Sequence, residues 1–258
     1  MTRIIINGCL GRLGTAISNA TQENLHFETV AGVDIITPVN ALPFPMHTDI
    51  KSCNQSADVV LVCTPPHATE VMLNTIEYCV AHHLPLMLCT TDLPREVIEK
   101  VSEATKDIAV LISANLSLGV NVLMHVVGKV AQALYDANFD IEIIEKHHNQ
   151  KLDAPSGTAY VLAETINTAL GGKLHYNHDR SPQKTPRKRD EIGLHAIRGG
   201  TITGEHSVIF AGSNEVIEIK HSAQSRDVFA TGALQAAQFI KNKPAGMYTM
   251  QDVINASN

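Results

Sequence analysis

The 258-residue sequence contains no tryptophan, and aromatic residues make up only 4% of it. So few aromatic side chains leave little surface on which nucleic-acid bases could stack. The formal net charge is −6, which provides no general attraction to the phosphates of DNA or RNA. Together these two observations argue against nucleic acid as a partner.

The five cysteines are odd in number, and no two of them form a Cys-x-x-Cys pair. They lie in apolar surroundings such as Leu61-Val62-Cys63, which is typical of reduced, buried thiols in a cytosolic protein. The start of the chain, Arg3-Ile4-Ile5-Ile6, resembles a strand and not a signal peptide. No apolar run approaches the ~18 residues that a membrane span needs, so we expect a cytoplasmic protein without a membrane segment.

The sequence has a hydrophobic content of 44% and a charged content of 18%, both ordinary for a globular protein. Its length favours two domains, at roughly 150 residues for each domain. Apolar strands alternate with helical segments from Arg3 to Ile112, which predicts an α/β, Rossmann-like, doubly wound parallel sheet. Several strands with glycine-rich turns between residues 191 and 222 predict a second sheet, mixed or antiparallel, together with a strand near residues 139–145.

A glycine-rich turn with Gly8, Gly11 and Gly14 directly follows the first apolar strand and precedes a helical segment. In this context a glycine turn binds the phosphates of a dinucleotide at the start of the helix. The spacing is G-x-x-G-x-x-G instead of the more familiar G-x-G-x-x-G, and many glycine turns bind nothing. The prediction of a dinucleotide site therefore depends on the order of strand, turn and helix.

Asp34 ends the second strand about twenty residues after the glycine turn, where a Rossmann domain binds ribose hydroxyls. An aspartate that merely turns the chain is the simpler alternative, but both the strand and the spacing favour the ribose role. Ile35 follows Asp34, and the nearest downstream cation is Lys51. Because the 2′-phosphate of NADPH normally needs a cation beside this acid, we expect NADH to be preferred, with NADPH also accepted.

A polar segment with two histidines and a lysine follows the apolar strand Phe139–Ile144. His147 and Lys151 are proton donors of different strength, whereas His148 faces the other way if the backbone is extended. Ser156-Gly157-Thr158 opens the next helix, and the free N–H groups of a helix start bind anions. This combination suits a small substrate that carries carboxylates and must be protonated.

Each part of this segment also has an ordinary explanation. Paired histidines on a loop are usually solvated, and Ser-Gly-Thr alone indicates only the start of a helix. Adjacent histidines rarely share a zinc ion, and no cysteine or acid lies at ligand spacing from them, so we expect no metal site. The combination of the parts, and not any single one, favours a catalytic site.

The longer pattern resembles a family signature: Glu145-x-His147-His148-x-x-Lys151-x-Asp153-Ala154-Pro155-Ser156-Gly157-Thr158-Ala159 is similar to that of the dihydrodipicolinate reductases (4-hydroxy-tetrahydrodipicolinate reductases) of lysine and diaminopimelate synthesis. The resemblance implies that His147 is the acid/base residue and that Lys151 is a proton donor. It implies that His148, Gly157 and Thr158 hold a carboxylate of a cyclic dicarboxylate substrate. The expected reaction is hydride transfer from NAD(P)H to that substrate.

The resemblance extends over nearly the whole chain and includes three segments near the cofactor. The family's Gly-x-x-Gly-Arg-Met-Gly turn has Leu13 here in place of Met, and its Gly-Thr-Thr-Gly turn has Cys89 in place of the first Gly. The family's Ala-Asn-Phe segment near the nicotinamide has Leu116 here in place of Phe. By resemblance the cofactor-binding residues are Gly8, Cys9, Leu10, Gly11, Arg12, Leu13, Asp34, Cys89, Thr90, Thr91, Ser113, Ala114, Asn115 and Leu116.

In that family the last part of the chain returns to the nucleotide domain, so the resemblance implies an inserted α+β domain that contains the mixed sheet. We expect residues 1–115 and 226–258 to form the dinucleotide-binding domain, and residues 116–225 to form the substrate-binding and oligomerisation domain. The resemblance further implies a homotetramer built through these sheets. The basic loop Arg180–Arg189 is expected to be solvated, near an anionic ligand.

Two other kinds of protein fit parts of the sequence. The first alternative is another two-domain NAD(P)-dependent dehydrogenase. A semialdehyde dehydrogenase of this kind needs a nucleophilic cysteine beside a base, and no cysteine here has such surroundings. Sugar dehydrogenases of similar layout resemble Glu-Lys-Pro after the fifth strand, unlike Cys89-Thr90-Thr91. A non-catalytic NAD-sensing protein would keep the glycine turn but has no need for His147 with Lys151.

Overall fold

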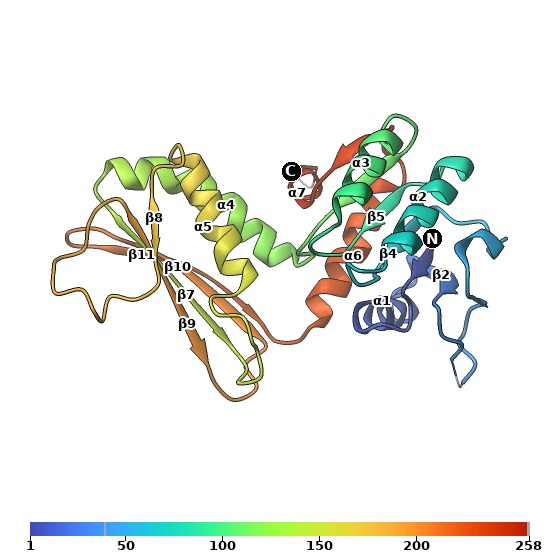
Figure 1. Cartoon of the computed structure of the whole chain (residues 1–258), viewed down its shortest axis with the longest axis horizontal. Helices are drawn as coiled ribbons and strands as arrows, with labels where there is room; N and C mark the ends of the chain where they lie inside the picture. Colours follow the sequence, from blue (N-terminus) through green and yellow to red (C-terminus); the bar gives the residue numbers. More distant parts are fainter. Residues whose placement is uncertain (39, 257–258) are drawn as a thin grey trace. The chain divides into compact units, whose positions relative to one another are not determined.

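The computed structural model describes residues 1–38 and 40–256, which form two compact units (Figure 1). The first unit comprises Met1–Leu118 and Asp227–Asn258, and the second comprises Gly119–Arg226. Both ends of the chain belong to the first unit, so the second is an insertion within it. The boundaries expected from the sequence lie after residues 115 and 225.

The first unit is built on a seven-stranded sheet in which every pairing is parallel. This confirms the predicted doubly wound parallel sheet. In spatial order its strands are β12 (Gly246–Tyr248), β6 (Ala109–Ile112), β5 (Leu86–Leu88), β4 (Val59–Val62), β1 (Thr2–Asn7), β2 (Phe27–Val33) and β3 (Met46–His47).

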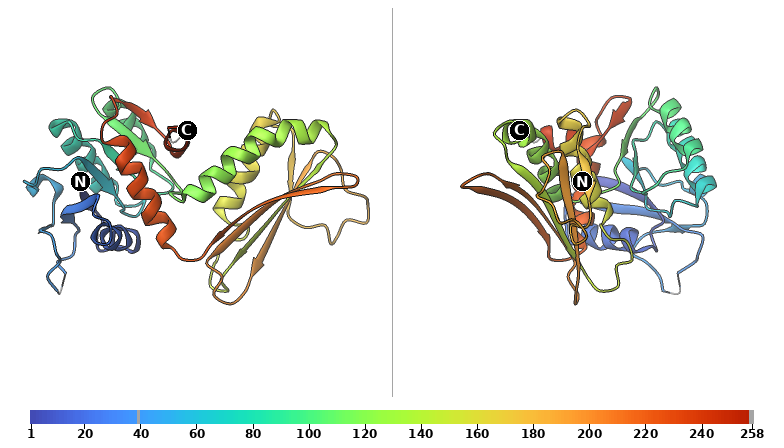
Figure 2. Two further views of the ribbon diagram at one scale, coloured as in Figure 1. Left: turned by 180° about the vertical axis from the view of Figure 1, so that it is seen from behind. Right: turned by 60° about the vertical axis from the view of Figure 1, so that its left-hand side comes forward.

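Helices cover both faces of this sheet (Figure 2). The central strand β4 explains why: Val59 and Leu61 contact one helix layer, Val60 and Val62 contact the other, and all four are fully buried. A continuous apolar run is what a parallel strand needs when both of its faces are covered. One layer contains α1 (Arg12–Gln22) and α6 (Asp227–Ile240), the other contains α2 (Thr69–His82) and α3 (Arg95–Ala104), and the short elements are η1 (Ile50–Ser52) and α7 (Met250–Asn255).

The glycine turn between β1 and α1 brings backbone groups into very close contact. Gly8 has a φ of +85°, and a Cβ there would lie 2.9 Å from the carbonyl group of Cys63. A Cβ on Gly14 would overlap the carbonyl oxygen of Gly8. Gly11 is the N-cap of α1, and in the described part of the chain no side chain caps this helix. The first N–H groups of α1 therefore stay available to an anion.

The second unit contains a five-stranded sheet in the order β11 (Val216–Ala223), β10 (Gly204–Ala211), β7 (Asp140–His147), β9 (Glu191–Arg198) and β8 (His175–Asn177). Strand β10 is antiparallel to both neighbours, whereas β7 and β8 are parallel to β9, so the sheet is mixed. Helices α4 (Leu118–Asp136) and α5 (Gly157–Ala169) pack on one face of it (Figure 2). The fully buried Ile143, Val208 and Phe210 lie in the core between them.

Some local expectations are wrong. His147 was expected on a loop but is the last residue of β7, because Lys146 and His147 still pair with Ile197 and Arg198 of β9. Strands β8 and β12 are absent from the expected elements, since three residues are too few for apolar alternation to be recognised.

The loop Arg180–Arg189 was expected to be solvated and near an anionic ligand, but its Arg180 and Arg187 form ion pairs with the second sheet. Arg187 donates Nη1 to Oδ1 of Asp140 at 2.7 Å and Nε to Oε1 of Glu142 at 2.9 Å. Arg180 pairs with Glu191 at the start of β9. Carboxylates at the starts of β7 and β9 attract these cations more directly than a distant anion could, so the loop is held to the sheet.

One helix among the described residues, α4, is long and apolar enough to cross a membrane by length and composition alone, which the sequence analysis did not anticipate. Its Leu123, Val127 and Ala131 lie in the core of the second unit. Asn121 and Lys129 interrupt its apolar sequence. We therefore attribute its composition to core packing.

The close contact at Gly14 gives a first prediction. Gly14→Ala should lower the free energy of unfolding by about 1–3 kcal/mol and weaken NADH binding, because the added methyl group must push the glycine turn away from α1. Chemical denaturation and NADH titration measure the two effects. Gly199→Ala is the matched control, since a Cβ there meets nothing within 4 Å. Equal stability of the two variants would contradict the prediction.

Candidate active site

Glu145 and His147 lie at the end of β7, two residues apart and therefore on the same face of the strand. The Nδ1 atom of His147 is 2.6 Å from Oε2 of Glu145. Glu145 is fully buried, so its carboxylate depends on protein donors in place of water. This pair is the centre around which the other polar groups of the second unit are arranged.

Arg198 and Ser156 provide the remaining donors to Glu145. Arg198, the last residue of β9, donates Nη1 to Oε2 at 2.7 Å and Nη2 to Oε1 at 2.6 Å. The backbone N–H of Ser156 donates to Oε1 at 2.9 Å. Burial raises the pKa of Glu145, but the hydrogen bonds from Arg198, His147 and Ser156 outweigh it and lower the pKa, so the carboxylate is ionised at neutral pH.

A buried imidazole, His206 of β10, lies next to His147. The ring centroids are 5.2 Å apart in an edge-to-face arrangement. The Nε2 atom of His206 is 3.1 Å from Oγ of Ser156, while its Nδ1 has no partner among the described residues. Burial, followed by the charge of His147, lowers the pKa of His206 to about 4, so this ring is neutral at pH 7.

Burial also has the largest influence on His147 and lowers its pKa, although Glu145 acts in the opposite direction. The charges of Lys151 and Arg198 lower the pKa further. Without a ligand, the ring is therefore mostly neutral at pH 7. Its Nε2 atom lies 3.1 Å from the position of a Cβ on Gly204, and the side chain keeps 12% of its surface exposed.

Lys151 lies on the loop that follows β7. Its Nζ is 2.7 Å from Oδ1 of Asp153, and the hydrogen bond from Lys151 is the main reason that the pKa of Asp153 is lowered. The backbone N–H of Lys151 donates to the carbonyl of His148 at 3.2 Å. The loop thus carries a partly exposed ammonium group with one carboxylate partner.

The helix start predicted at Ser156-Gly157-Thr158 is present: α5 begins at Gly157, and Oγ of Ser156 accepts from the N–H of Ala159 at 3.3 Å. A Cβ on Gly157 would meet nothing within 4 Å. There is consequently open space beside the first turn of this helix, to which Thr158 belongs. A carboxylate can enter such a space and meet the positive end of the helix dipole.

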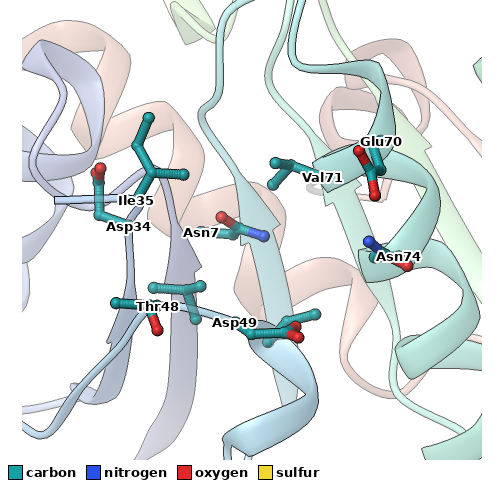
Figure 3. Close-up of a pocket in the computed structure, with 10 residues that line it drawn as sticks. Asn7, Asp34, Ile35, Thr48, Asp49, Glu70, Val71 and Asn74 are labelled. Atoms are coloured by element: carbon teal, nitrogen blue, oxygen red, sulfur yellow. The ribbon is translucent and has the colours of Figure 1, made fainter.

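The first unit has a pocket of about 210 Å³ at the carboxyl ends of β1 and β2 (Figure 3). Its lining includes three carboxylates, and its residues are Asn7, Val33, Asp34, Ile35, Thr48, Asp49, Ile50, Glu70, Val71 and Asn74. Oδ2 of Asp34 accepts from the N–H of Leu10 at 3.0 Å, which ties the glycine turn to the end of β2. Asp34 therefore lies beside both the turn and the pocket.

The other expected cofactor residues have different surroundings. Oγ1 of Thr90 donates to the carbonyl of Thr64 at 2.7 Å, and Oγ of Ser113 donates to the carbonyl of Asn115 at 2.7 Å. These bonds shape the loops after β5 and β6. Leu116 is 3% exposed and packs in the core of the first unit, so a cofactor could meet only its backbone. Of the remaining residues, Cys9 is buried, four are half-buried (Leu10, Leu13, Cys89 and Asn115), and three are exposed (Arg12, Thr91 and Ala114).

The expected residues thus form two groups, one in each unit. The glycine turn, Asp34 and residues 89–91 and 113–116 belong to the first unit, and His147, His148, Lys151, Gly157 and Thr158 belong to the second. Among the described residues, no group of three or more His, Cys, Asp or Glu side chains is placed to hold a metal ion.

Sequence reasoning gave no role to Glu145, Arg198 or His206. Glu145 could have been found, because it precedes His147 by two residues on a strand. Arg198 and His206 could not, since their positions depend on the register of β9 and β10 against β7.

Comparison with known proteins identifies the family of the chain. The models of the dihydrodipicolinate reductase N-terminus and C-terminus match residues 2–116 and 119–254. The chain is 47% identical over 254 residues to the 4-hydroxy-tetrahydrodipicolinate reductase of Caldanaerobacter subterraneus subsp. tengcongensis, covering 98% of each chain. It is 44% identical over 258 residues to that of Clostridium novyi (strain NT), covering 100% of each.

Among solved structures, a dipicolinate-bound dihydrodipicolinate reductase from Paenisporosarcina sp. TG-14 has the same fold, with a TM-score of 0.80. The sequences are 22% identical, and the alignment covers 96% of this chain and 97% of that one. The family models cover nearly all of the chain, and the identities above extend over its full length. The chain therefore belongs to the dihydrodipicolinate reductase family.

Proposed function

We propose that this chain reduces 4-hydroxy-tetrahydrodipicolinate in lysine and diaminopimelate biosynthesis: loss of the 4-hydroxyl group as water gives dihydrodipicolinate, and a hydride from NAD(P)H together with a proton converts this to tetrahydrodipicolinate. Membership of the reductase family supports the reaction. The observation that carries the assignment of the site is the His147 ring, hydrogen-bonded to Glu145 and located near Lys151. A non-catalytic NAD-binding protein has no use for this arrangement.

The cofactor, when bound, supplies the hydride. His147 and Lys151 then protonate the reduced substrate, a contribution of about 10²–10⁴-fold for a well-positioned acid. The mostly neutral His147 gains its proton more readily once an anionic substrate is near, since an opposite charge favours the charged form. The first turn of α5, with Gly157 and Thr158, and the neighbouring His148 hold a substrate carboxylate.

The glycine turn fits the pyrophosphate of the cofactor, because only glycine leaves room at Gly8 and Gly14 and the start of α1 is uncapped. Asp34 is placed to bind the adenosine ribose. The loops after β5 and β6, which include Thr91 and Asn115, would lie toward the nicotinamide end.

We further infer that NADH is preferred over NADPH. The carboxylates of Asp34, Asp49 and Glu70 all line the pocket that receives the ribose, and each repels a 2′-phosphate. Lys51, the nearest cation along the chain, is held at 2.9 Å by Oδ1 of Asn74 and lies 3.8 Å from Glu77. The pocket thus has an acidic lining whose neighbouring cation is already paired.

A homotetramer is supported by the face of the mixed sheet that α4 and α5 do not cover. Strand β10 has the fully buried Val208 and Phe210 on its helix-covered side and the half-buried Ile209 on the other. Ile144 of β7 and the exposed Ile197 of β9 share the side of Ile209. Such a surface favours association with other copies. The five free cysteines suit the cytoplasm.

The proton-transfer pair gives a second prediction. His147→Gln should lower kcat by about 10²–10⁴-fold with nearly normal NADH binding, because only proton transfer is lost. Lys151→Ala should lower kcat and weaken substrate binding together. NADH absorbance after substrate addition measures turnover, and His175→Gln, at an exposed histidine of the same unit, is the control. If the variant with both substitutions, His147→Gln and Lys151→Ala, turned over at the rate of the unmodified protein, the assignment of these two residues as proton donors would be refuted.

The acidic pocket gives a third prediction. The unmodified protein should favour NADH over NADPH by about tenfold in kcat/KM, equivalent to about 1.4 kcal/mol. Ile35→Arg should narrow or reverse the difference, because it places a cation in the pocket lining. Ile36→Arg adds the same charge at the next position, outside the lining, and should have a smaller effect. Equal kcat/KM for both cofactors at low salt would show that the pocket does not discriminate.

The uncovered sheet face gives a fourth prediction. Light scattering at micromolar concentration should show about four times the chain mass of 27.9 kDa. Ile209→Asp should reduce the assembly, because a carboxylate would be buried at the interface. Leu25→Asp, at a residue 90% exposed in the first unit, should leave the mass unchanged. A monomer in the unmodified protein would reject this assembly.

A further inference from the structure

We propose that Glu145, itself held by Arg198, is a positioning residue that keeps the His147 ring in one tautomer and one orientation, with Nδ1–H bound to Glu145 and Nε2 left to exchange the proton with the substrate. The inference rests on the proposed role of His147. It goes further by assigning the proton-exchanging nitrogen and the group that selects it.

The tautomer follows from the chemistry of the contact. An ionised carboxylate can only accept hydrogen bonds, so the 2.6 Å contact between Oε2 of Glu145 and Nδ1 of His147 requires the hydrogen to be on Nδ1. A neutral imidazole has one N–H group, and Nε2 is therefore the unprotonated nitrogen. That atom faces the small Gly204, where no side chain stands in the way.

The carboxylate itself cannot rotate, because all of its acceptor capacity is used. Each oxygen has about two lone-pair sites, which gives about four for the group. Four donors occupy them: the Nδ1 of His147 and Nη1 of Arg198 on Oε2, and the N–H of Ser156 and Nη2 of Arg198 on Oε1. Any rotation of Glu145 would break at least two of these bonds inside a buried site.

Arg198 is also anchored by backbone groups. Its Nη2 donates to the carbonyl of Asp153 at 2.6 Å, on the loop that carries Lys151, and its Nη1 donates to the carbonyl of Ile197 at 2.8 Å. Glu145 meanwhile binds the N–H of Ser156, directly before α5. The carboxylate therefore fixes His147 relative to both the lysine loop and the helix start. Such placement of reacting groups is a large part of catalysis.

Glu145 also influences the charge of His147. The charged and titratable groups around the ring are Glu145 on β7, Arg198 on β9, His206 on β10 and Lys151 on the adjoining loop. Of these, only the carboxylate favours protonation of the ring, whereas burial and the cations oppose it. Loss of this negative charge must lower the pKa of His147. The pH above which turnover falls should then move to lower pH.

The test combines a spectroscopic and a kinetic measurement on the full-length protein. In the ligand-free protein with ¹⁵N-labelled histidine, NMR should show His147 with its hydrogen on Nδ1, and Glu145→Gln should shift it to a mixture of tautomers. The same substitution should lower kcat by roughly 10²-fold or more, as when the carboxylate partner of a catalytic histidine is replaced, with the KM for NADH unchanged. Its pH–kcat profile should shift to lower pH.

The chain offers a matched control on the same strand. Glu142 faces the other side of β7 and also pairs with a histidine and an arginine, since its carboxylate lies 2.7 Å from Nε2 of His195 and 2.9 Å from Nε of Arg187. Glu142→Gln should leave the His147 resonances and kcat unchanged. If it reproduced both effects of Glu145→Gln, the effects would be structural and the proposal would fail.

Arg198→Lys provides a second variant if Glu145→Gln unfolds, as thermal unfolding will show. It keeps the positive charge but loses the two-pronged contact, so it should give a smaller fall in kcat and partial tautomer mixing. A single, unchanged Nδ1–H tautomer in the folded variants would overturn the proposal. The NMR measurement needs no substrate, so it tests the tautomer proposal independently of the catalytic role of His147. The catalytic role would be rejected by a different result, full turnover of the His147→Gln variant.

Discussion

The buried carboxylate of Glu145 requires hydrogen-bond donors around it, and several parts of the second unit supply them. An ionised group removed from water costs several kcal/mol unless donors surround it. Here the donors come from the end of β7, the end of β9 and the residue before α5, so three segments far apart in the sequence must meet at one point. The register of the mixed sheet and the position of α5 are therefore linked to the geometry of the His147 ring. The same hydrogen bonds that satisfy the buried charge of Glu145 also fix the orientation of the His147 ring.

The two units differ in how their positively and negatively charged groups are arranged. In the first, the glycine turn leaves the N–H groups of α1 without a side-chain cap, and this suits phosphate, while carboxylates such as Asp34 line the neighbouring pocket. Positive and negative regions thus lie at successive points where different parts of one dinucleotide would bind. In the second, Lys151 and the backbone N–H of Gly157 at the start of α5 both contact the carboxylate of Asp153. Under the function proposed above, each unit would bind an anion beside a helix start, the pyrophosphate of the cofactor at α1 and a substrate carboxylate at α5.

The sequence predicted most of what depends on local pattern. The parallel sheet followed from continuous apolar strands such as β4, and the start of α5 from Ser156. The surroundings of His147 were predicted only in part, because Arg198 joins the site through strand register, which sequence spacing does not reveal. Leu116 had been placed near the cofactor by resemblance; its side chain is buried in the core of the first unit, and its backbone carbonyl lies against Gly232. Local periodicity thus predicted the elements, and long-range pairing determined the contacts between them.

The interrupted first unit has a consequence for the order in which the protein can fold during synthesis. Its β12 pairs with β6, and α6 supplies buried residues such as Ala233 and Ile240 to the core beside α1. These parts leave the ribosome after the second unit, so until then the nucleotide-binding unit lacks the edge strand β12 and two helices, α6 and α7. The second unit is continuous and ends at Arg226, before that point. Since domains fold as units when their chain is available, the inserted unit can become compact first, in contrast to the usual order from the N-terminus.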